Sequence, residues 1–439
     1  MRDDGGMRMP ALLSGRLGPL EERQFRLFWT GQATSAVGDS LVPIAMVFAV
    51  LRLGGGPGGI GLVLASITLP RVLLLLVGGV WADRLPRQLV MVGADIARGT
   101  VNVIFAVLLL TGHAQLWHLV AGAAIIGAAS AFFFPATTGL IPETVSPGRL
   151  QQANALMSLS RNTSQIIGPS VSGLMVATVG PGWVFALDAA TFAVSAISLL
   201  ALRLPDQKQS AQARGFRAEL AGGWHEVASR RWLLAAIITF GISNVGMAPV
   251  FVLGPVIARD HLGGSTSWGL FVTSLGIGGL LGGLLALRWR PRHPLATGFA
   301  LSIAIALPAL ALVPPLGLPL IVIAGICAFA VIELGNTWWY TVLQQQVPPE
   351  ALSRVSSYDW LASLIFQPIG FAVVGPVALL MGAGPTLYAG AALNVLANVG
   401  VLSIPAVRHL TMRDRPGDEA MAEGRRIEPG PVAGPVELE

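Results

Sequence analysis

The chain has 439 residues, of which 53% are hydrophobic and 12% are charged; the charged share is about half that of a soluble globular protein. The 51 charged residues are unevenly spread, with 9 in residues 1–26, 9 in 203–231 and 12 in 408–439, which leaves 21 for the other 352 residues. So few charges cannot cover a surface that faces water, whereas they suffice for one that faces lipid. The composition therefore excludes a set of soluble domains and predicts an all-α integral membrane protein.

Several other classes of protein are excluded by what the sequence lacks. The only cysteine is Cys327, and no pair of the six histidines has the spacing of a zinc motif, so we expect no disulfide framework and no metal site. No phosphate-binding loop ends in Gly-Lys-Ser or Gly-Lys-Thr, and no paired carboxylates or nucleophile–base pair recur at useful spacing. We therefore expect neither an ATP-driven pump nor an enzyme, and no cofactor. The sequence pI near 10.3 reflects basic residues beside apolar spans rather than a nucleic-acid partner.

Apolar runs separated by polar or Gly-Pro turns predict twelve membrane-spanning helices of about 20 residues or more. Their approximate limits are 26–51, 57–82, 88–111, 116–140, 152–179, 183–203, 231–258, 265–288, 294–313, 317–346, 354–382 and 385–407. Pro308, Pro314 and Pro319 blur the limits of the spans from residue 294 onward, because proline interrupts helical hydrogen bonding.

The Lys and Arg residues between the spans predict the orientation, because connections on the cytoplasmic side carry an excess of them. With the N-terminus in the cytoplasm, thirteen of these residues lie in inner connections and only two, Arg52 and Arg259, lie in outer ones. We therefore expect a multi-pass protein of the cell (plasma) membrane with both termini in the cytoplasm, embedded in the bilayer as a monomer.

Two cytoplasmic corners recur about 200 residues apart and indicate an internal repeat. Residues 145–150 correspond to 347–352 at an offset of 202, and the Gly-Gly pair at 78–79 corresponds to that at 282–283 at an offset of 204. A repeat of six spans makes the two halves parallel, with a substrate cavity between them near the membrane midplane. The predicted parts are an N-terminal cytoplasmic segment (1–25), a six-helix half (26–204), a cytoplasmic linker with an amphipathic helix (205–230), a second six-helix half (231–407) and a disordered cytoplasmic tail (408–439).

The strongest local motif lies at the inner end of the second span. Residues 79–88 read Gly-Val-Trp-Ala-Asp-Arg-Leu-Pro-Arg-Gln, which resembles the loop between helices two and three of the major facilitator superfamily, Gly-x-x-x-Asp-Arg-x-Gly-Arg-Lys/Arg. The matching residues are Gly79, Asp83, Arg84 and Arg87, whereas Pro86 replaces a glycine and Gln88 a basic residue. The resemblance implies the twelve-helix fold of that superfamily and a charged cluster that holds an inner gate shut in one state. The alternative is a plain cytoplasmic loop with an incidental ion pair.

The fifth span carries a second motif, Gly168-Pro169-Ser170-Val171-Ser172-Gly173. It resembles the antiporter motif of the same superfamily, Gly-Pro-x-x-Gly-Gly, in which Gly168, Pro169 and Gly173 match and Ser172 replaces a glycine by another small residue. The motif is found in exporters and seldom in importers, so the resemblance implies export. The alternative is an ordinary kinked helix, because Gly and Pro are common in membrane spans.

A third strip, residues 134–155, covers the corner between the fourth and fifth spans. Together with Gly38-Asp39 in the first span and the linker at 205–230, it resembles the proton-coupled efflux branch that includes macrolide and siderophore exporters. The resemblance runs from about residue 20 to residue 407 and does not identify the substrate.

Ionisable residues within the spans are few and costly to bury, so each is a candidate functional residue. Asp39 lies about thirteen residues into the first span, where a carboxyl could bind and release a proton, and it is our first candidate for proton coupling; a structural partnership with Arg71 or Arg161 is the alternative. Glu333 in the tenth span is the second candidate. Arg71 and Arg161 could line the cavity or neutralise a carboxylate.

Four further charged residues are assigned supporting roles. Asp95 and Arg98 are three residues apart in the third span, so they can pair with each other or with the motif at 79–88 and support the inner gate. Asp188 and Asp359 lie nearer the ends of their spans, and we expect them to be solvated or to cap helices.

Aromatic and amide side chains in the spans are candidates for substrate contacts. Trp338, Trp339 and Tyr340 lie near the inner end of the tenth span, where they either anchor the helix at the membrane interface or form an aromatic wall of the cavity. The intramembrane amides could hydrogen-bond either a substrate or a neighbouring helix; they are Asn162, Asn244, Asn336 and Gln367.

These features favour a secondary transporter that exports an amphipathic organic molecule in exchange for protons, by rocking of the two halves. An importer or uniporter of a polar or anionic solute on the same fold is the alternative, and Arg71 and Arg161 would suit an anion. A sensor or partner protein that transports nothing is disfavoured by the gate motif and the buried ionisable groups.

Overall fold

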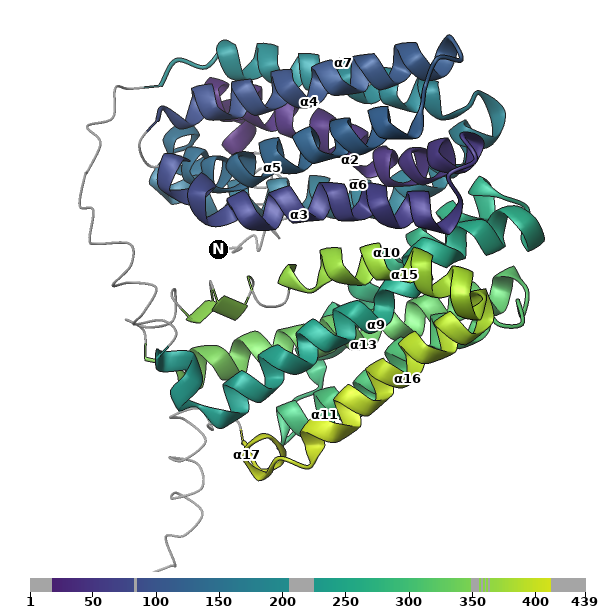
Figure 1. The fold of residues 1–439 in the computed structure, drawn as a ribbon. Helices are drawn as coiled ribbons and strands as arrows, with labels where there is room; N and C mark the ends of the chain where they lie inside the picture. The colour runs from purple at the N-terminus through teal and green to yellow at the C-terminus, as the bar shows by residue number, and fades with distance from the viewer. Residues whose placement is uncertain are drawn as a thin grey trace, which may run out of the picture.

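The protein is a bundle of helices in two groups, seen in a computed structural model that describes residues 18–82, 85–204, 225–348, 355–356, 358–359, 361 and 364–411. The first group, purple to teal in Figure 1, lies on one side of the bundle, and the second, teal to yellow, lies on the other. Within the described residues the secondary structure is helical, apart from an isolated bridge between Leu312 and Pro315. The all-α fold predicted from composition is confirmed.

The first group, described between residues 18 and 204, contains six long helices. They are α2 (Arg23–Arg52), α3 (Gly56–Ala82), α4 (Arg87–Leu110), α5 (Leu116–Thr144), α6 (Leu150–Thr178) and α7 (Pro181–Leu200), with short 3₁₀ turns η1 (Gly18–Glu21) and η2 (Pro147–Arg149). Helix α2 packs on α6 and α7, α3 packs on α5, and α4 packs on α5 and α7. All six begin and end within four residues of the predicted limits. Gly180, with φ of +92°, supplies the backbone conformation that ends one span before the next begins.

The second group is described from residue 225 to residue 411, with gaps between residues 349 and 363. Its helices are α9 (Arg231–His261), α10 (Ser265–Arg288), α11 (Pro294–Leu301), η3 (Ser302–Ala306), α12 (Leu307–Ala311), α13 (Leu318–Gln346), α15 (Gln367–Met381), α16 (Ala383–Leu402) and α17 (Pro405–Arg408). The predicted limits of 265–288 match α10, and those of 231–258 and 317–346 fall within three residues of α9 and α13.

Three predicted spans of the second group differ from the structure. The span at 385–407 is divided after Leu402 into α16 and α17. The span at 294–313 is interrupted by η3, because Pro308 has no N–H to donate to the helix and its ring opposes a preceding turn. The span at 354–382 begins its continuous helix only at Gln367, after a turn at Phe366. Helical residues precede that turn, and residues 349–354 lie outside the described part of the chain.

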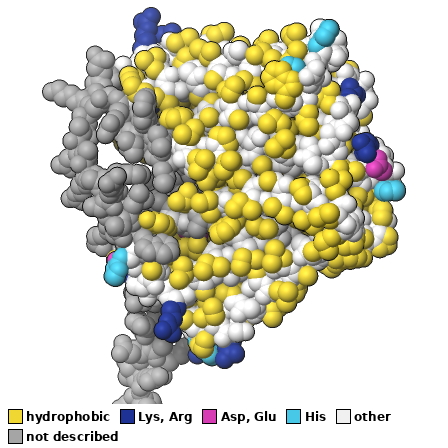
Figure 2. Space-filling view, in the orientation of Figure 1, with side chains coloured by type: hydrophobic (Ala, Val, Ile, Leu, Met, Phe, Trp, Pro, Cys, Tyr) yellow, Lys and Arg dark blue, Asp and Glu magenta, His cyan; other side chains and the backbone are white. Residues whose placement is uncertain are grey.

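Ten helices of the described residues are long and apolar enough to cross a membrane. The two other helices needed for a count of twelve are α6, which has the length but more polar residues, and α15, which has 15 residues. Large hydrophobic side chains lie on the outside of the bundle, with Leu379 82% and Leu380 86% exposed. On the face in Figure 2, hydrophobic side chains cover much of the described surface and charged ones lie at its margins. This surface suits lipid rather than water.

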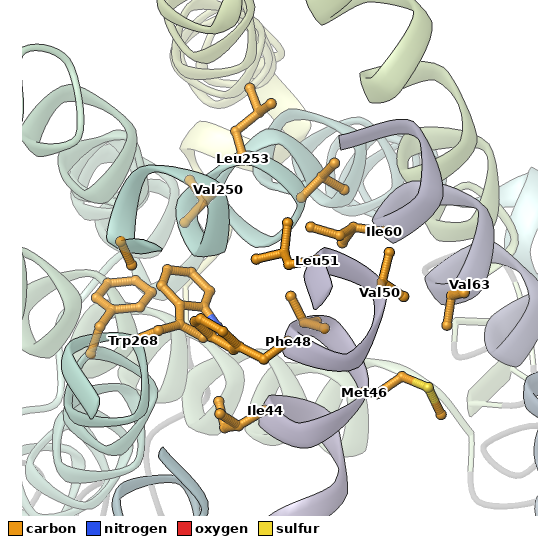
Figure 3. Packing of buried hydrophobic residues seen from close by; sticks show 14 of the residues in the cluster. Ile44, Met46, Phe48, Val50, Leu51, Ile60, Val63, Val250, Leu253 and Trp268 are labelled. Atoms are coloured by element: carbon orange, nitrogen blue, oxygen red, sulfur yellow. The ribbon is translucent and has the colours of Figure 1, made fainter. Parts of the chain in front are cut away.

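We call the end of the bundle that carries Arg23, Arg231 and Arg408 the terminal end, and the opposite one the far end. The two groups meet at the far end. Helix α6 packs on α10 and α3 packs on α15 across the boundary between the groups. A single apolar cluster joins them, in which Phe48, Leu51 and Ile60 face side chains of the second group, as Figure 3 shows; these are Val250, Leu253 and Trp268.

Close helix contact at the far end depends on residues without side chains. A Cβ added to Gly269 of α10 would lie 2.3 Å from the carbonyl oxygen of Pro169 in α6, a distance that no real contact reaches. Hydrogen bonds cross the same boundary, from Ser265 Oγ to the Gly173 carbonyl at 2.9 Å and between the hydroxyls of Ser170 and Thr273 at 2.6 Å. The far end is therefore closed by direct helix contact.

The predicted segments at 1–25, 205–230 and 408–439 lie mostly outside the described residues, which omit 1–17, 205–224 and 412–439. Residues 225–229 are helical, and they belong to the stretch in which an amphipathic helix is predicted. The limits of the two six-helix halves remain predictions.

Candidate functional site

Each group of helices contains a cavity. The cavity of the first group has a volume of about 380 Å³ and is lined from all six long helices, α2 to α7. Its charged lining residues are Asp39, Arg71, Arg98, Arg161 and Asp188. Because ionisable groups are costly at this depth, their convergence on one cavity marks it as the candidate site.

Asp39 lies on α2 at the wall of this cavity. Its side chain is 44% exposed, and its Oδ2 lies 3.6 Å from Nη1 of Arg98 on α4. The ion pair of Asp39 with Arg98 was not considered from the sequence, and the two arginines that were, Arg71 and Arg161, line the same cavity. A carboxylate that is both accessible from the cavity and held beside a cation can change its protonation state without unfolding the site.

Arg98 is the centre of a buried polar network. Its side chain is 4% exposed and its Nη2 donates to Asp95 Oδ1 at 2.5 Å, so the pairing predicted from their spacing is confirmed. The second oxygen of Asp95 accepts a hydrogen bond from Ser195 Oγ of α7 at 2.6 Å. The guanidinium also lies over the rings of Phe133 and Phe192, 4.1 and 4.4 Å from their centroids. One arginine thus links α2, α4, α5 and α7.

We expect Arg98→Met to destabilise the protein, because it leaves the fully buried carboxylate of Asp95 without its cation. Removing one partner of a buried ion pair costs about 3–5 kcal/mol. Thermal unfolding of the purified protein in detergent measures the loss. Arg161→Met, which removes an exposed arginine from the same cavity, is the matched control and should change the midpoint far less. Equal midpoints for the two variants would contradict this role of Arg98.

Asp188 is buried, so its predicted solvation is wrong. It is 1% exposed and accepts hydrogen bonds from Asn102 Nδ2 at 2.6 Å and from Thr191 Oγ1 at 3.2 Å. A Cβ on Gly38 would lie 2.1 Å from Asp188 Oδ1, so only glycine lets α2 pass this carboxylate. The sequence carried a signal for it, because Asn102 lies four residues after Arg98 and hence on the same face of α4.

The antiporter-like motif lies between α2 and α10. Gly168 is packed against Ser40 of α2, and Ser172 donates to the Leu41 carbonyl at 2.6 Å. On the other side, Pro169 and Gly173 contact α10 as described above. The small residues of this motif therefore allow one helix to contact both halves of the bundle.

The gate-like motif is described only in part. Asp83 and Arg84 lie outside the described residues, and Gly79 lies within α3. Arg87 begins α4, and its Nη1 donates to Glu143 Oε1 at 2.8 Å and to the Gly139 carbonyl at 3.0 Å. This arginine therefore joins α4 to α5 at the terminal end.

The cavity of the second group has a volume of about 300 Å³ and is lined by α9, α11, η3, α13 and α16 together with Asp359 and Leu364. Asn244 and Asn336, two of the intramembrane amides, line this cavity. Asp359 is 4% exposed and accepts a hydrogen bond from Trp339 Nε1 at 3.0 Å, so its predicted solvation is also wrong.

Trp339 and Tyr340 line the cavity, whereas Trp338 does not. Its ring packs edge-on against Trp289 with centroids 5.2 Å apart, and its Nε1 donates to the Trp289 carbonyl at 3.1 Å. Neighbouring residues of a helix point about 100° apart, so Trp338 and Trp339 face different surroundings.

Three other predicted site residues lie apart from the lining of both cavities. Glu333 is exposed on α13, Asn162 is exposed on α6, and Gln367 is the first residue of α15. The structure does not bring Glu333 into the cavity that contains Asp39.

Comparison with known proteins identifies the family. A family model described as the Major Facilitator Superfamily matches residues 28–371. The multidrug efflux pump Tap of Mycolicibacterium fortuitum is 26% identical over 399 residues, which cover 87% of this chain and 96% of that protein. Macrolide efflux protein A of Streptococcus pyogenes is 23% identical over 355 residues, which cover 79% of this chain and 87% of that one.

Solved structures share the fold. The nucleoside transporter NupG superposes with a TM-score of 0.68 at 14% identity, covering 87% of this chain and 98% of that one. A bacterial homologue of the iron transporter ferroportin, in an inward-facing state, gives a TM-score of 0.68 at 14% identity over 87% and 98% of the two chains. Because the family model matches residues 28–371, most of the chain, this protein belongs to the Major Facilitator Superfamily of membrane transporters for small molecules.

Proposed function

We propose that this transporter exports an amphipathic organic molecule, such as a drug, an antibiotic or a siderophore-like compound, in exchange for protons. The observation that carries the proposal is Asp39, a carboxylate exposed in a cavity within the apolar helices and held 3.6 Å from Arg98. The similarity of the chain to multidrug and macrolide efflux proteins over most of its length supports export. The motif from Gly168 to Gly173 supports it too, since this pattern resembles the antiporter motif.

In this mechanism the two halves rock against each other, and the cavity that contains Asp39 lies within the first of them. The far end is closed by contact of α6 with α10 and of α3 with α15. We assign the terminal end to the cytoplasmic side of the plasma membrane. This arrangement then corresponds to the state that loads substrate from the cytoplasm. Asp39 would release its proton in the state open to the cytoplasm and bind one in the state open to the far side. Glu333 on α13 is the second candidate for this role.

We assign the gate at the terminal end to the motif at 79–88 with its supporting ion pair. Asp83, Arg84 and Arg87 would close this end when the far end opens, while the Asp95–Arg98 pair holds α4 in place. The proposal treats residues 26–204 and 231–407 as the two moving bodies and 205–230 as the linker between them.

Import or uniport of a polar or anionic solute is the second candidate. Three arginines, Arg71, Arg98 and Arg161, line the cavity of the first group and would attract an anion. Two aspartates in the same lining offset part of that charge, which favours the export proposal.

Uptake into inside-out membrane vesicles tests the direction and the energy source. With an acidic interior, the export proposal predicts that a labelled macrolide or another amphipathic drug accumulates above its outside concentration and leaks out when a protonophore is added. Uptake that never exceeds equilibration, with the protein verified in the membrane, would indicate import or uniport instead.

A further inference from the structure

The cavity of the second group has aromatic walls. Phe240 meets Trp339 edge-on, with centroids 5.0 Å apart and planes at 88°, and it stacks on Phe299 at 5.7 Å. Tyr340 lines the same cavity, so its aromatic side chains come from α9, α11 and α13. Aromatic faces carry negative partial charge and attract organic cations within about 6 Å of the ring centre.

The same cavity contains a carboxylate that is only partly satisfied. Asp359 is 4% exposed and its Oδ2 accepts the hydrogen bond from Trp339 Nε1, whereas its Oδ1 has no hydrogen-bond partner among the described residues. No ion pair of Asp359 occurs within that part of the chain. A buried negative charge is costly unless a cation compensates it.

The charges of the two cavities differ in sign. Arginines line the cavity of the first group, which contains Arg71, Arg98 and Arg161. The described lining of the second cavity contains neither Lys nor Arg, and its polar side-chain groups besides Asp359 are hydroxyls, amides and the indole N–H of Trp339. A positive charge on a substrate is therefore attracted to the second cavity, whereas the three arginines of the first outnumber its two aspartates and repel it.

We propose that the cavity of the second group is a subsite for the cationic group of the substrate, an organic ammonium or phosphonium. Asp359 supplies the counter-charge, and the rings of Phe240, Trp339 and Tyr340 supply the apolar and cation–π contacts. The inference rests on the proposed export function and adds the substrate class. It also separates two tasks, with proton exchange at Asp39 in one half and binding of the organic cation in the other.

Binding of tetraphenylphosphonium to the purified full-length protein, measured by equilibrium dialysis, tests the subsite. Asp359→Asn removes the charge but keeps an oxygen that can accept the Trp339 N–H bond. We expect it to weaken tetraphenylphosphonium binding by about tenfold or more, the usual worth of a contact with a charged group. Binding of triphenylphosphine oxide, an uncharged triaryl compound, should remain unchanged.

Trp338→Phe is the matched control, because Trp338 is the neighbouring residue of α13 but does not line the cavity. It should preserve the preference for the cation over the neutral compound. A purely structural carboxylate would instead give Asp359→Asn the same loss for both compounds, which would overturn the proposal. Should Asp359→Asn fail to fold, the wild type alone decides, since the subsite requires it to bind the cation about tenfold more tightly than the neutral compound.

The failures of the two proposals are distinguishable. Proton-driven export of a neutral drug, together with tetraphenylphosphonium binding that does not depend on Asp359, would overturn the subsite and leave the export function standing. Binding of the cation that depends on Asp359, without proton-driven export of any compound, would support the subsite and overturn the function.

Discussion

Asp39→Asn is expected to abolish proton-driven transport while the protein still folds and inserts. The amide cannot take up and release a proton, and it keeps the size and the polar contact of the carboxylate beside Arg98. Coupling between two sites is typically worth about 5- to 150-fold. We therefore expect the concentration ratio that vesicles reach in a proton gradient to fall by about tenfold or more, with substrate binding retained.

Asp260→Asn is the matched control for this charge change. Asp260 is exposed near the end of α9 and pairs with Arg259 at 2.7 Å, away from the lining of both cavities. Its removal should leave the concentration ratio at the wild-type value. An Asp39→Asn protein that accumulates substrate as well as the wild type would remove Asp39 from the coupling mechanism.

Gly269→Val is expected to force the two halves apart at the far end. The added Cβ would lie 2.3 Å from the Pro169 carbonyl oxygen, so α10 or α6 must move. Overpacking of a tight contact costs about 1–3 kcal/mol, which changes the equilibrium between two states by about 5- to 150-fold. The closed far end should lose population, and transport should stop because the cycle cannot return to it.

Cysteine accessibility measures this change directly. In a Cys327→Ser background, Val250→Cys places a thiol where the side chain is 3% exposed between the halves (Figure 3). Gly269→Val should raise its rate of reaction with a membrane-impermeant maleimide added from the far side by about tenfold. Gly279→Val lies on the same helix, where an added Cβ meets no atom within 4 Å, and should leave the rate unchanged. Equal rates for the two variants would mean that the Gly269 contact does not close this end.

Most helix limits were predictable because local signals determine them. Glycines with positive φ and prolines end the apolar runs, so the limits of α10 follow from the residues alone. One exception is the span at 294–313, where the run of apolar residues continues through a break that Pro308 and η3 introduce. Hydropathy shows that a segment is apolar, and the residues before and after the break are equally apolar. It therefore does not reveal the break.

The candidate site was predictable only where its contacts are local. Asp95 and Arg98 pair because three residues bring them to one face of one helix. The Asp39–Arg98 pair joins α2 to α4, and its formation depends on how those helices slide and rotate against each other. No local pattern encodes that register, which is why Arg71 and Arg161 were equally plausible partners.

Asp188 and Asp359 were misplaced for a related reason. Depth along a span was the only measure available, and it says nothing about what covers a side chain from a neighbouring helix. Asp188 is covered by α2 at Gly38 and hydrogen-bonded from Asn102 on α4, and Asp359 is hydrogen-bonded from Trp339 on α13. The neighbouring helices, rather than the depth along the span, determine whether these carboxylates are buried.

Proton movement driven by substrate tests the central claim most directly. Inside-out vesicles that contain the protein and an acidic interior would receive amphipathic drugs, macrolides and siderophores in turn, while a pH-sensitive dye reports the interior. Proton-coupled export through the Asp39 cavity predicts that at least one compound makes the interior less acidic in wild-type vesicles and that Asp39→Asn abolishes the response. A compound that accumulates in the vesicles without changing their internal pH, or a response that persists in Asp39→Asn, would contradict the account.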